Sequence, residues 1–124
     1  MSWATAVGAP SLSASSVQGV AAAGASTYAA GCTAGAASIG ANPVPTPLTT
    51  ASGAFVARLD ASGAVQWSRR FTGVVITPCV TGLATDASGD LYVVLRGGTV
   101  TAENGPSLPA ATVSGSVVLI KYGA

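Results

Sequence analysis

Hydrophobic and polar residues alternate in short runs along the chain, with the period of two that is typical of half-buried β-strands. FVARLD (55–60) and VQWSRRF (65–71) are two such runs, joined by the turn residues ASGA. VTGLATD (80–86) and DLYVVLR (90–96) are two more, separated by ASG. Because Ser and Gly favour tight turns between β-type runs, each pair is predicted to form an antiparallel hairpin.

The rest of the chain gives no helical signal. Glycines interrupt the Ala-rich segment 21–37, and each costs a helix about 1 kcal/mol. SVVLIKY (116–122) is a further β-type run. Between 97 and 115 the Gly, Pro and Asn content predicts a long loop, with one edge strand at Thr99 to Ala102. The sequence therefore predicts an all-β protein.

The chain is a tandem repeat of one unit of about 62 to 64 residues. We expect one two-unit domain over 1–124, with repeat 1 at about 1–63 and repeat 2 at about 64–124. Four strands fall in each unit. The matching pairs are segment 16–31 with 79–95, segment 52–60 with 114–123, Tyr28 with Tyr92, Arg58 with Lys121, and Trp3 with Trp67.

The second copy resembles a known repeat family. FVARLDASGAVQWSRRF followed by VTGLATDASGDLYVV is similar to the bacterial SBBP-type β-propeller repeat of exported and cell-surface proteins. Asp90 stands where that family usually has Asn, and the first copy departs further, with Ala23, Ala29 and Ala30 at the places of Asp86, Val93 and Val94. The resemblance implies two propeller blades per chain, each a four-stranded antiparallel sheet.

In such blades the strand nearest the central channel comes first, so we expect VTGLATD innermost, then DLYVVLR, SVVLIKY and the Trp67 strand. The last blade then lacks an outer strand, and Met1 to Val7 is an outer strand without a blade. Two blades cannot close a ring, so we expect a head-to-tail homo-oligomer of three or four copies by strand exchange. An excised or engineered two-blade unit fits the same expectation, and a truncated portion that aggregates or packs irregularly is the alternative. The residues expected to exchange are Trp3, Ala4, Val7, Val118, Ile120 and Tyr122.

Charge excludes several partners. Charged residues are 7% of the 124, with five Lys and Arg and a net charge of +1. Nucleic acids and acidic membranes need clustered cations, so neither is expected as a partner. The sequence has no run of eighteen consecutive apolar residues, which a membrane-spanning segment would need, and its N-terminus lacks a signal-peptide pattern. A surface of Ser, Thr, Ala and Gly favours an extracellular or cell-surface location.

Cys32 and Cys79 are the two cysteines, and their spacing fits no metal motif. They fall at the open ends of equivalent hairpins, where neighbouring blades would place them at one level. The sequence leaves two alternatives open, a blade-to-blade disulfide and two separate buried thiols.

No metal, cofactor or catalytic site is predicted. Asp86 and Asp90 flank a turn in a way that suggests calcium, but an Asp before a hairpin turn more often bonds its own backbone, as Asp60 would. There is no histidine, and a serine paired with Lys121 is the one general-base arrangement available.

Trp67, Arg69 and Arg70 are the candidates for a ligand surface, through stacking and charge on a sugar or an anion. Alternation along an outer strand more often puts one side into the packing and the other into water. The function expected is a structural assembly module, and the alternative is a lectin-like propeller that binds a glycan or another ligand.

Overall fold

The structure is a computed structural model that describes Ala4 and residues 7–8, 16–33, 37–39, 42–44, 53–74, 79–102, 113–114 and 117–123. Every regular element in these ranges is a β-strand, which confirms the all-β prediction. Within the same ranges no helix is long and apolar enough to cross a membrane.

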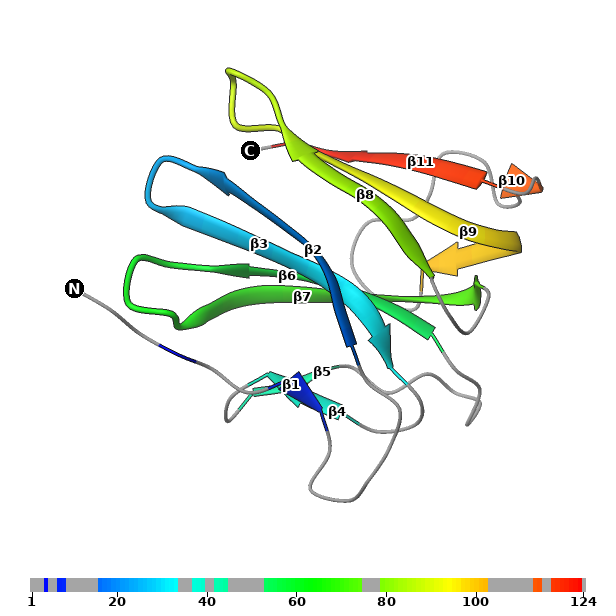
Figure 1. Ribbon diagram of the computed structural model, residues 1–124, viewed down its shortest axis with the longest axis horizontal. Helices are drawn as coiled ribbons and strands as arrows, with labels where there is room; N and C mark the ends of the chain where they lie inside the picture. The colour runs from blue at the N-terminus through cyan, green and yellow to red at the C-terminus, as the bar shows by residue number, and fades with distance from the viewer. Residues whose placement is uncertain are drawn as a thin grey trace.

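The first sheet has four antiparallel strands in chain order: β2 (Ser16–Ala23), β3 (Ser26–Thr33), β6 (Gly53–Leu59) and β7 (Val65–Val74). Each strand pairs with the next, so the sheet is an up-and-down meander (Figure 1). The predicted hairpin of 55–60 with 65–71 is confirmed as β6 and β7. The Trp67 strand lies at the end of the meander, in the order that the sequence predicts.

The second sheet has three antiparallel strands: β8 (Val80–Thr85), β9 (Leu91–Ala102) and β11 (Val117–Tyr122), with β9 in the centre. The predicted hairpin of 80–86 with 90–96 is confirmed as β8 and β9. In Figure 1 this sheet lies above the first one, and the C-terminus follows β11. Among the described strands, the second sheet thus has one fewer than the first.

Strand β9 is longer than the sequence predicts. The expected loop began at Gly97, but β9 continues to Ala102, so Thr99 to Ala102 is the end of this strand and not a separate edge strand. This end pairs with β7 and with the two-residue β10 (Val113–Ser114). Cross-strand pairing satisfies backbone groups that a loop would leave open, and the β-branched Thr and Val suit a strand. The pairing joins the two sheets.

A small third sheet is formed by β1 (Val7–Gly8), β4 (Ala37–Ile39) and β5 (Asn42–Val44), in the order β1-β4-β5. It lies beside the first sheet in Figure 1, where β1 contacts β2 and β5 contacts β7. The sequence did not predict β4 or β5, because runs of three residues are too short to show a period.

The two repeats share a backbone irregularity as well as residues. The pairing of β2 with β3 shifts register between Val17 and Gly19, and that of β8 with β9 shifts between Val80 and Gly82. Such a bulge bends the strand locally. At Gly19 an added Cβ would lie 3.0 Å from the Cβ of Leu83, so glycine allows β2 to approach β8 closely.

The main core lies between the first and second sheets, which pack face to face. Alternate side chains of each strand point into it, as the period of two requires. A second cluster of Phe55, Ala57 and Leu59 is buried on the other face of the first sheet. The buried residues of the main core are Tyr28, Ala30, Cys32, Ala54, Val56, Phe71, Cys79, Val80, Leu91, Val93, Leu95, Val118 and Ile120.

Val93 and Val20 offer a matched test of this core, because Val93 is 0% exposed and Val20 is 64% exposed. Val93→Ala is expected to lower the free energy of unfolding by about 1.5 to 3 kcal/mol, whereas Val20→Ala changes it by about 0.5 kcal/mol or less. Urea denaturation of both variants measures the difference. Equal losses would contradict the sheet-on-sheet core.

Candidate functional site

The open ends of two hairpins meet at a disulfide between Cys32, at the end of β3, and Cys79, just before β8. The two Cα atoms are 5.8 Å apart, and both residues are buried. The Cys79 N–H donates to the Cys32 sulfur at 3.1 Å, and the Arg96 N–H donates to the Cys79 carbonyl at 2.8 Å. Of the two alternatives from the sequence, the structure has the bridge between the repeats.

The side chain of Gln18 closes the same junction. This residue lies in the bulge of β2, and its Oε1 accepts a hydrogen bond from the Val80 N–H at 2.9 Å. At the other end of these two strands, the Thr85 hydroxyl donates to the Ala22 carbonyl at 2.9 Å. Side-chain hydrogen bonds therefore link β2 and β8 at both ends, although the two strands form no backbone hydrogen-bond ladder with each other.

Removing the bridge is expected to weaken the fold. The Cys32→Ser/Cys79→Ser variant should lose roughly 2 to 4 kcal/mol of unfolding free energy, because the bridge restricts the unfolded chain. A thiol assay on the unfolded wild-type protein should find no free thiol before reduction and two after it. Two thiols before reduction would contradict the bridge.

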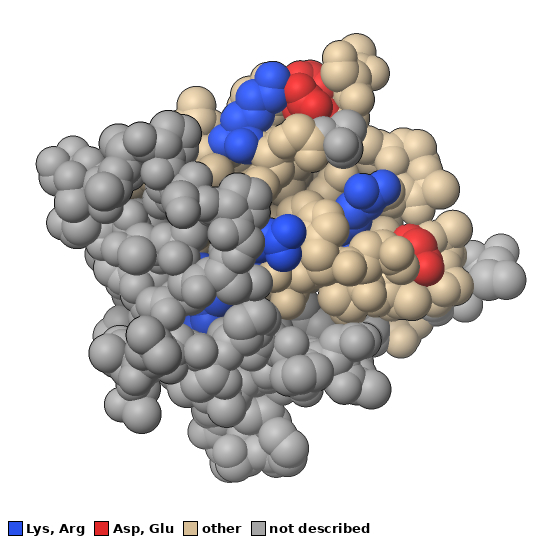
Figure 2. All heavy atoms as spheres, turned by 180° about the vertical axis from the view of Figure 1, so that it is seen from behind, with Lys and Arg blue, Asp and Glu red and all other residues tan. Residues whose placement is uncertain are grey.

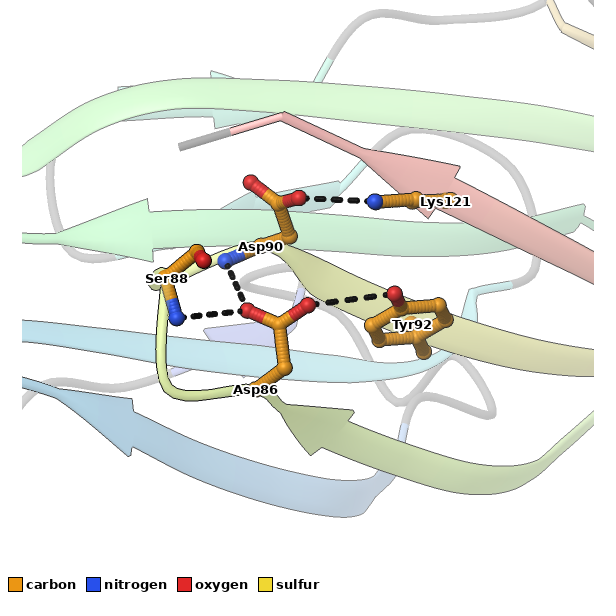
Figure 3. A network of polar contacts seen from close by, with 5 residues as sticks. All are labelled: Asp86, Ser88, Asp90, Tyr92 and Lys121. Atoms are coloured by element: carbon orange, nitrogen blue, oxygen red, sulfur yellow. Dashed lines mark hydrogen bonds and ion pairs between the residues drawn. The ribbon is translucent and has the colours of Figure 1, made fainter.

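The two D-A-S-G turns are built alike. Asp60 Oδ1 accepts from the N–H groups of Ser62 and Ala64 at 2.8 and 3.0 Å. Asp86 Oδ1 accepts from the N–H groups of Ser88 and Asp90 at 2.9 and 3.0 Å (Figure 3). In both turns the glycine has a positive φ, 85° at Gly63 and 84° at Gly89, which other residues rarely adopt. Of the two carboxylates that the calcium interpretation would have used, Asp86 thus bonds the turn backbone and Asp90 pairs with Lys121. The described residues hold no group of three or more possible metal ligands.

Asp60 has the denser network of the two. Besides the two backbone bonds, it accepts from the Ser62 hydroxyl at 2.7 Å and from the Gln66 amide at 2.9 Å. The Ser62 hydroxyl bond, with the backbone donors of Ala64 and Ser62, lowers the pKa of Asp60 below its ordinary value. These bonds favour the charged form, so the turn is most stable when Asp60 is ionised.

This pKa shift predicts a pH dependence. A lowered folded pKa gives a stabilisation that is fully present above the ordinary value of 3.8 and is lost as pH falls through the lower folded value. Asp60→Asn should therefore be less stable than wild type at pH 7, and the two should converge below about pH 3.8. Urea denaturation from pH 7 to pH 2 measures it, and a gap that does not change with pH would contradict the assignment.

Lys121 forms an ion pair with Asp90, Nζ to Oδ2 at 2.8 Å, and lies 5.4 Å from the ring centroid of Tyr92 (Figure 3). Tyr92 in turn donates its hydroxyl to Asp86 Oδ2 at 3.1 Å. The bonds with Asp90 and Tyr92 raise the pKa of Lys121 above its ordinary value. Because a serine–lysine pair needs a neutral amine, this arrangement disfavours Lys121 as a general base.

Trp67 lies among aromatic rings between the two sheets. Its ring centroid is 6.1 Å from that of Tyr28 and 5.7 Å from that of Tyr122, and Tyr122 is 6.5 Å from Phe71. Burial raises the pKa of Tyr122 to about 12, although the charge of Arg69 acts in the opposite direction. Trp67 therefore packs the first sheet against the second.

The expected ligand surface of Trp67, Arg69 and Arg70 is only partly formed. The Arg69 guanidinium lies 4.8 Å from the Trp67 ring centroid, and its Nη1 donates to the Ser68 carbonyl at 3.0 Å. Arg70 is 0% exposed, so it lies within the packing and not on the surface. Its side chain lies beside Gly53, where an added Cβ would be 3.1 Å from Arg70 Nε and would also meet the Phe71 carbonyl.

The residues expected to exchange are distributed unevenly. Trp3 lies outside the described residues, Ala4 is exposed, and Val7 pairs with Ile39 of β4. Val118 and Ile120 are 1% and 7% exposed in the core between the sheets, and Tyr122 is half-buried. These three side chains therefore face the first sheet of their own chain, and only the backbone edge of β11 could meet another strand.

A pocket of about 400 Å³ lies between the β2–β3 turn and the β8–β9 turn. Arg58 of β6 lines it, and its Nε donates to the Ser26 hydroxyl at 3.0 Å. The sequence aligns Arg58 with Lys121, but it did not predict the pocket. The available signal was the match of Ser26 with Asp90. The other lining residues are Ala22, Ala23, Gly24, Tyr28, Thr85, Asp86, Ala87, Ser88 and Gly89.

Charged side chains are few over the described surface. Figure 2 shows the basic and acidic groups on one face in small separate groups, without an extended basic patch. No protein-family model, curated protein or solved structure matches the chain.

Proposed function

We propose that this protein is a structural assembly module whose two sheets are β-propeller blades of the SBBP type. Copies join head to tail into a ring of three or four chains, on the outside of a cell. Each copy gives residues 1–7, the donor segment, to the β11 edge of the next. The observation that carries the proposal is a difference in strand number among the described strands. The first sheet has a fourth strand, β7, beside β6, whereas the second sheet has no strand beyond β11.

A row of three cross-strand residues in the first sheet has only two counterparts among the described strands of the second sheet. In the first sheet Tyr28 lies opposite Arg58, and Arg58 lies opposite Trp67, across three adjacent strands. In the second sheet Tyr92 lies opposite Lys121, and β11 has no further partner among the described strands. Since Trp3 matches Trp67, the row supports a register for the donor segment in which Trp3 lies opposite Lys121.

The outer face of the second sheet supports the same assembly. Val117 and Leu119 are 56% and 64% exposed, although they correspond in the repeat to Ala54 and Val56, which are both 0% exposed. Exposed apolar side chains on an edge strand favour association with a further strand. In the proposed register Val7 lies opposite Val117, as Phe71 lies opposite Ala54 in the first sheet.

Strand exchange competes with a short intramolecular pairing. Val7 and Gly8 pair with Ile39 and Ser38 as β1 and β4. The donor segment would replace this two-residue pairing by one over residues 3–7 against 117–121. The longer pairing satisfies more backbone groups and covers more apolar surface, so exchange is expected at protein concentrations that allow chains to meet.

Native mass tests the proposal. Light scattering behind a sizing column is expected to give three or four chain masses. Trp3→Ala should weaken association by roughly 2 kcal/mol or more, about thirtyfold, because a buried tryptophan is a common hot spot. Ala61→Ser, a change at an exposed position of the turn between β6 and β7, is the control and should not alter the mass. A folded monomer at every concentration would sink the proposal.

A further inference from the structure

We infer that the pocket between the two inner hairpin turns binds a small molecule through a carboxylate held by Arg58. All of its lining residues belong to one chain, so the inference does not depend on ring assembly. Its volume of about 400 Å³ suits a ligand at the small end of the usual range.

Comparison of the repeats shows what Arg58 lacks. Lys121, its counterpart, is neutralised by Asp90 at 2.8 Å. Ser26 occupies the position of Asp90, because it precedes Tyr28 by two residues as Asp90 precedes Tyr92. Arg58 therefore meets a hydroxyl, 3.0 Å from its Nε, where the second repeat supplies a carboxylate.

The one acidic residue in the lining does not replace it. Asp86 uses Oδ1 for the N–H groups of Ser88 and Asp90, and Oδ2 for the Tyr92 hydroxyl (Figure 3). Among the described residues, no carboxylate forms an ion pair with Arg58. The lining thus holds one cation and one anion, but both oxygens of Asp86 already accept hydrogen bonds, so Arg58 is the charged group left to bind an anionic ligand.

The guanidinium specifies the kind of anion. Its planar N–H donors match the two oxygens of a carboxylate, and the bond from Nε to Ser26 fixes the plane of the group. Serine, alanine and glycine dominate the rest of the lining, and at Gly24 an added Cβ would meet nothing within 4 Å. Small polar walls with open space suit a hydroxylated body, so the ligand class is a sugar acid or a similar hydroxy acid.

The test is an NMR titration of the full chain with D-glucuronate, with D-glucose as the uncharged control. Amide shifts at Gly24, Ser26, Ser88 and Gly89 are expected to saturate with a dissociation constant of about millimolar for glucuronate, and not to saturate for glucose. Arg58→Gln should weaken binding at least tenfold. Arg96→Gln, a change at an exposed arginine on β9, is the matched control and should bind like wild type.

A second variant, Ser26→Asp, distinguishes loss of binding from loss of folding in Arg58→Gln. Ser26→Asp places in the first repeat the carboxylate that the second has, so it should pair with Arg58, keep or raise the melting temperature, and abolish glucuronate binding. Glucuronate shifts that persist in both Arg58→Gln and Ser26→Asp would overturn the inference. Equal binding of glucose, or tighter binding of inorganic phosphate at the same amides, would overturn the carboxylate assignment.

Discussion

The face-to-face packing of the first sheet on the second is the interaction on which the rest of the structure depends. The first sheet brings small side chains to it, such as Ala30 and Ala54, so each buries little apolar area against Leu95 and its neighbours. The disulfide at Cys32 and the hydrogen bond from Val80 to Gln18 add links at this interface that do not depend on side-chain volume. A chain with 7% charged residues has few surface ion pairs to add to these links.

That packing also fixes which faces remain for other contacts. The buried face of the first sheet, with Val56, corresponds in the repeat to the exposed face of the second, with Leu119. The covered outer face of the first sheet, with Phe55, corresponds to the face of the second that packs inward, with Val118. Each sheet has two apolar faces, and the contact between the two sheets covers one face of each. The exposed face of the second sheet, with Leu119, is therefore of the same kind as the face that the first sheet buries. The proposed assembly rests on this geometry more than on any single contact.

The sequence predicted the elements whose signal is local. Both D-A-S-G hairpins were found because alternation and turn residues act over a few positions, and the turn role of Asp60 follows from the same chemistry. The burial of Arg70 and the length of β9 were missed, because each depends on strands that are distant in sequence. Alternation along β7 does imply that Arg69 and Arg70 face opposite sides, but it cannot tell which side is covered. Nothing local distinguished a disulfide from two thiols.

The pocket arises from two differences between otherwise matching repeats. The turn between β2 and β3 has two residues, Gly24 and Ala25, whereas the equivalent turn of the second repeat runs from Asp86 to Asp90. The shorter turn leaves space beside the longer one, and Ser26 stands next to it where the second repeat has the Asp90 carboxylate that neutralises Lys121. Both differences therefore lie at or beside the same turn.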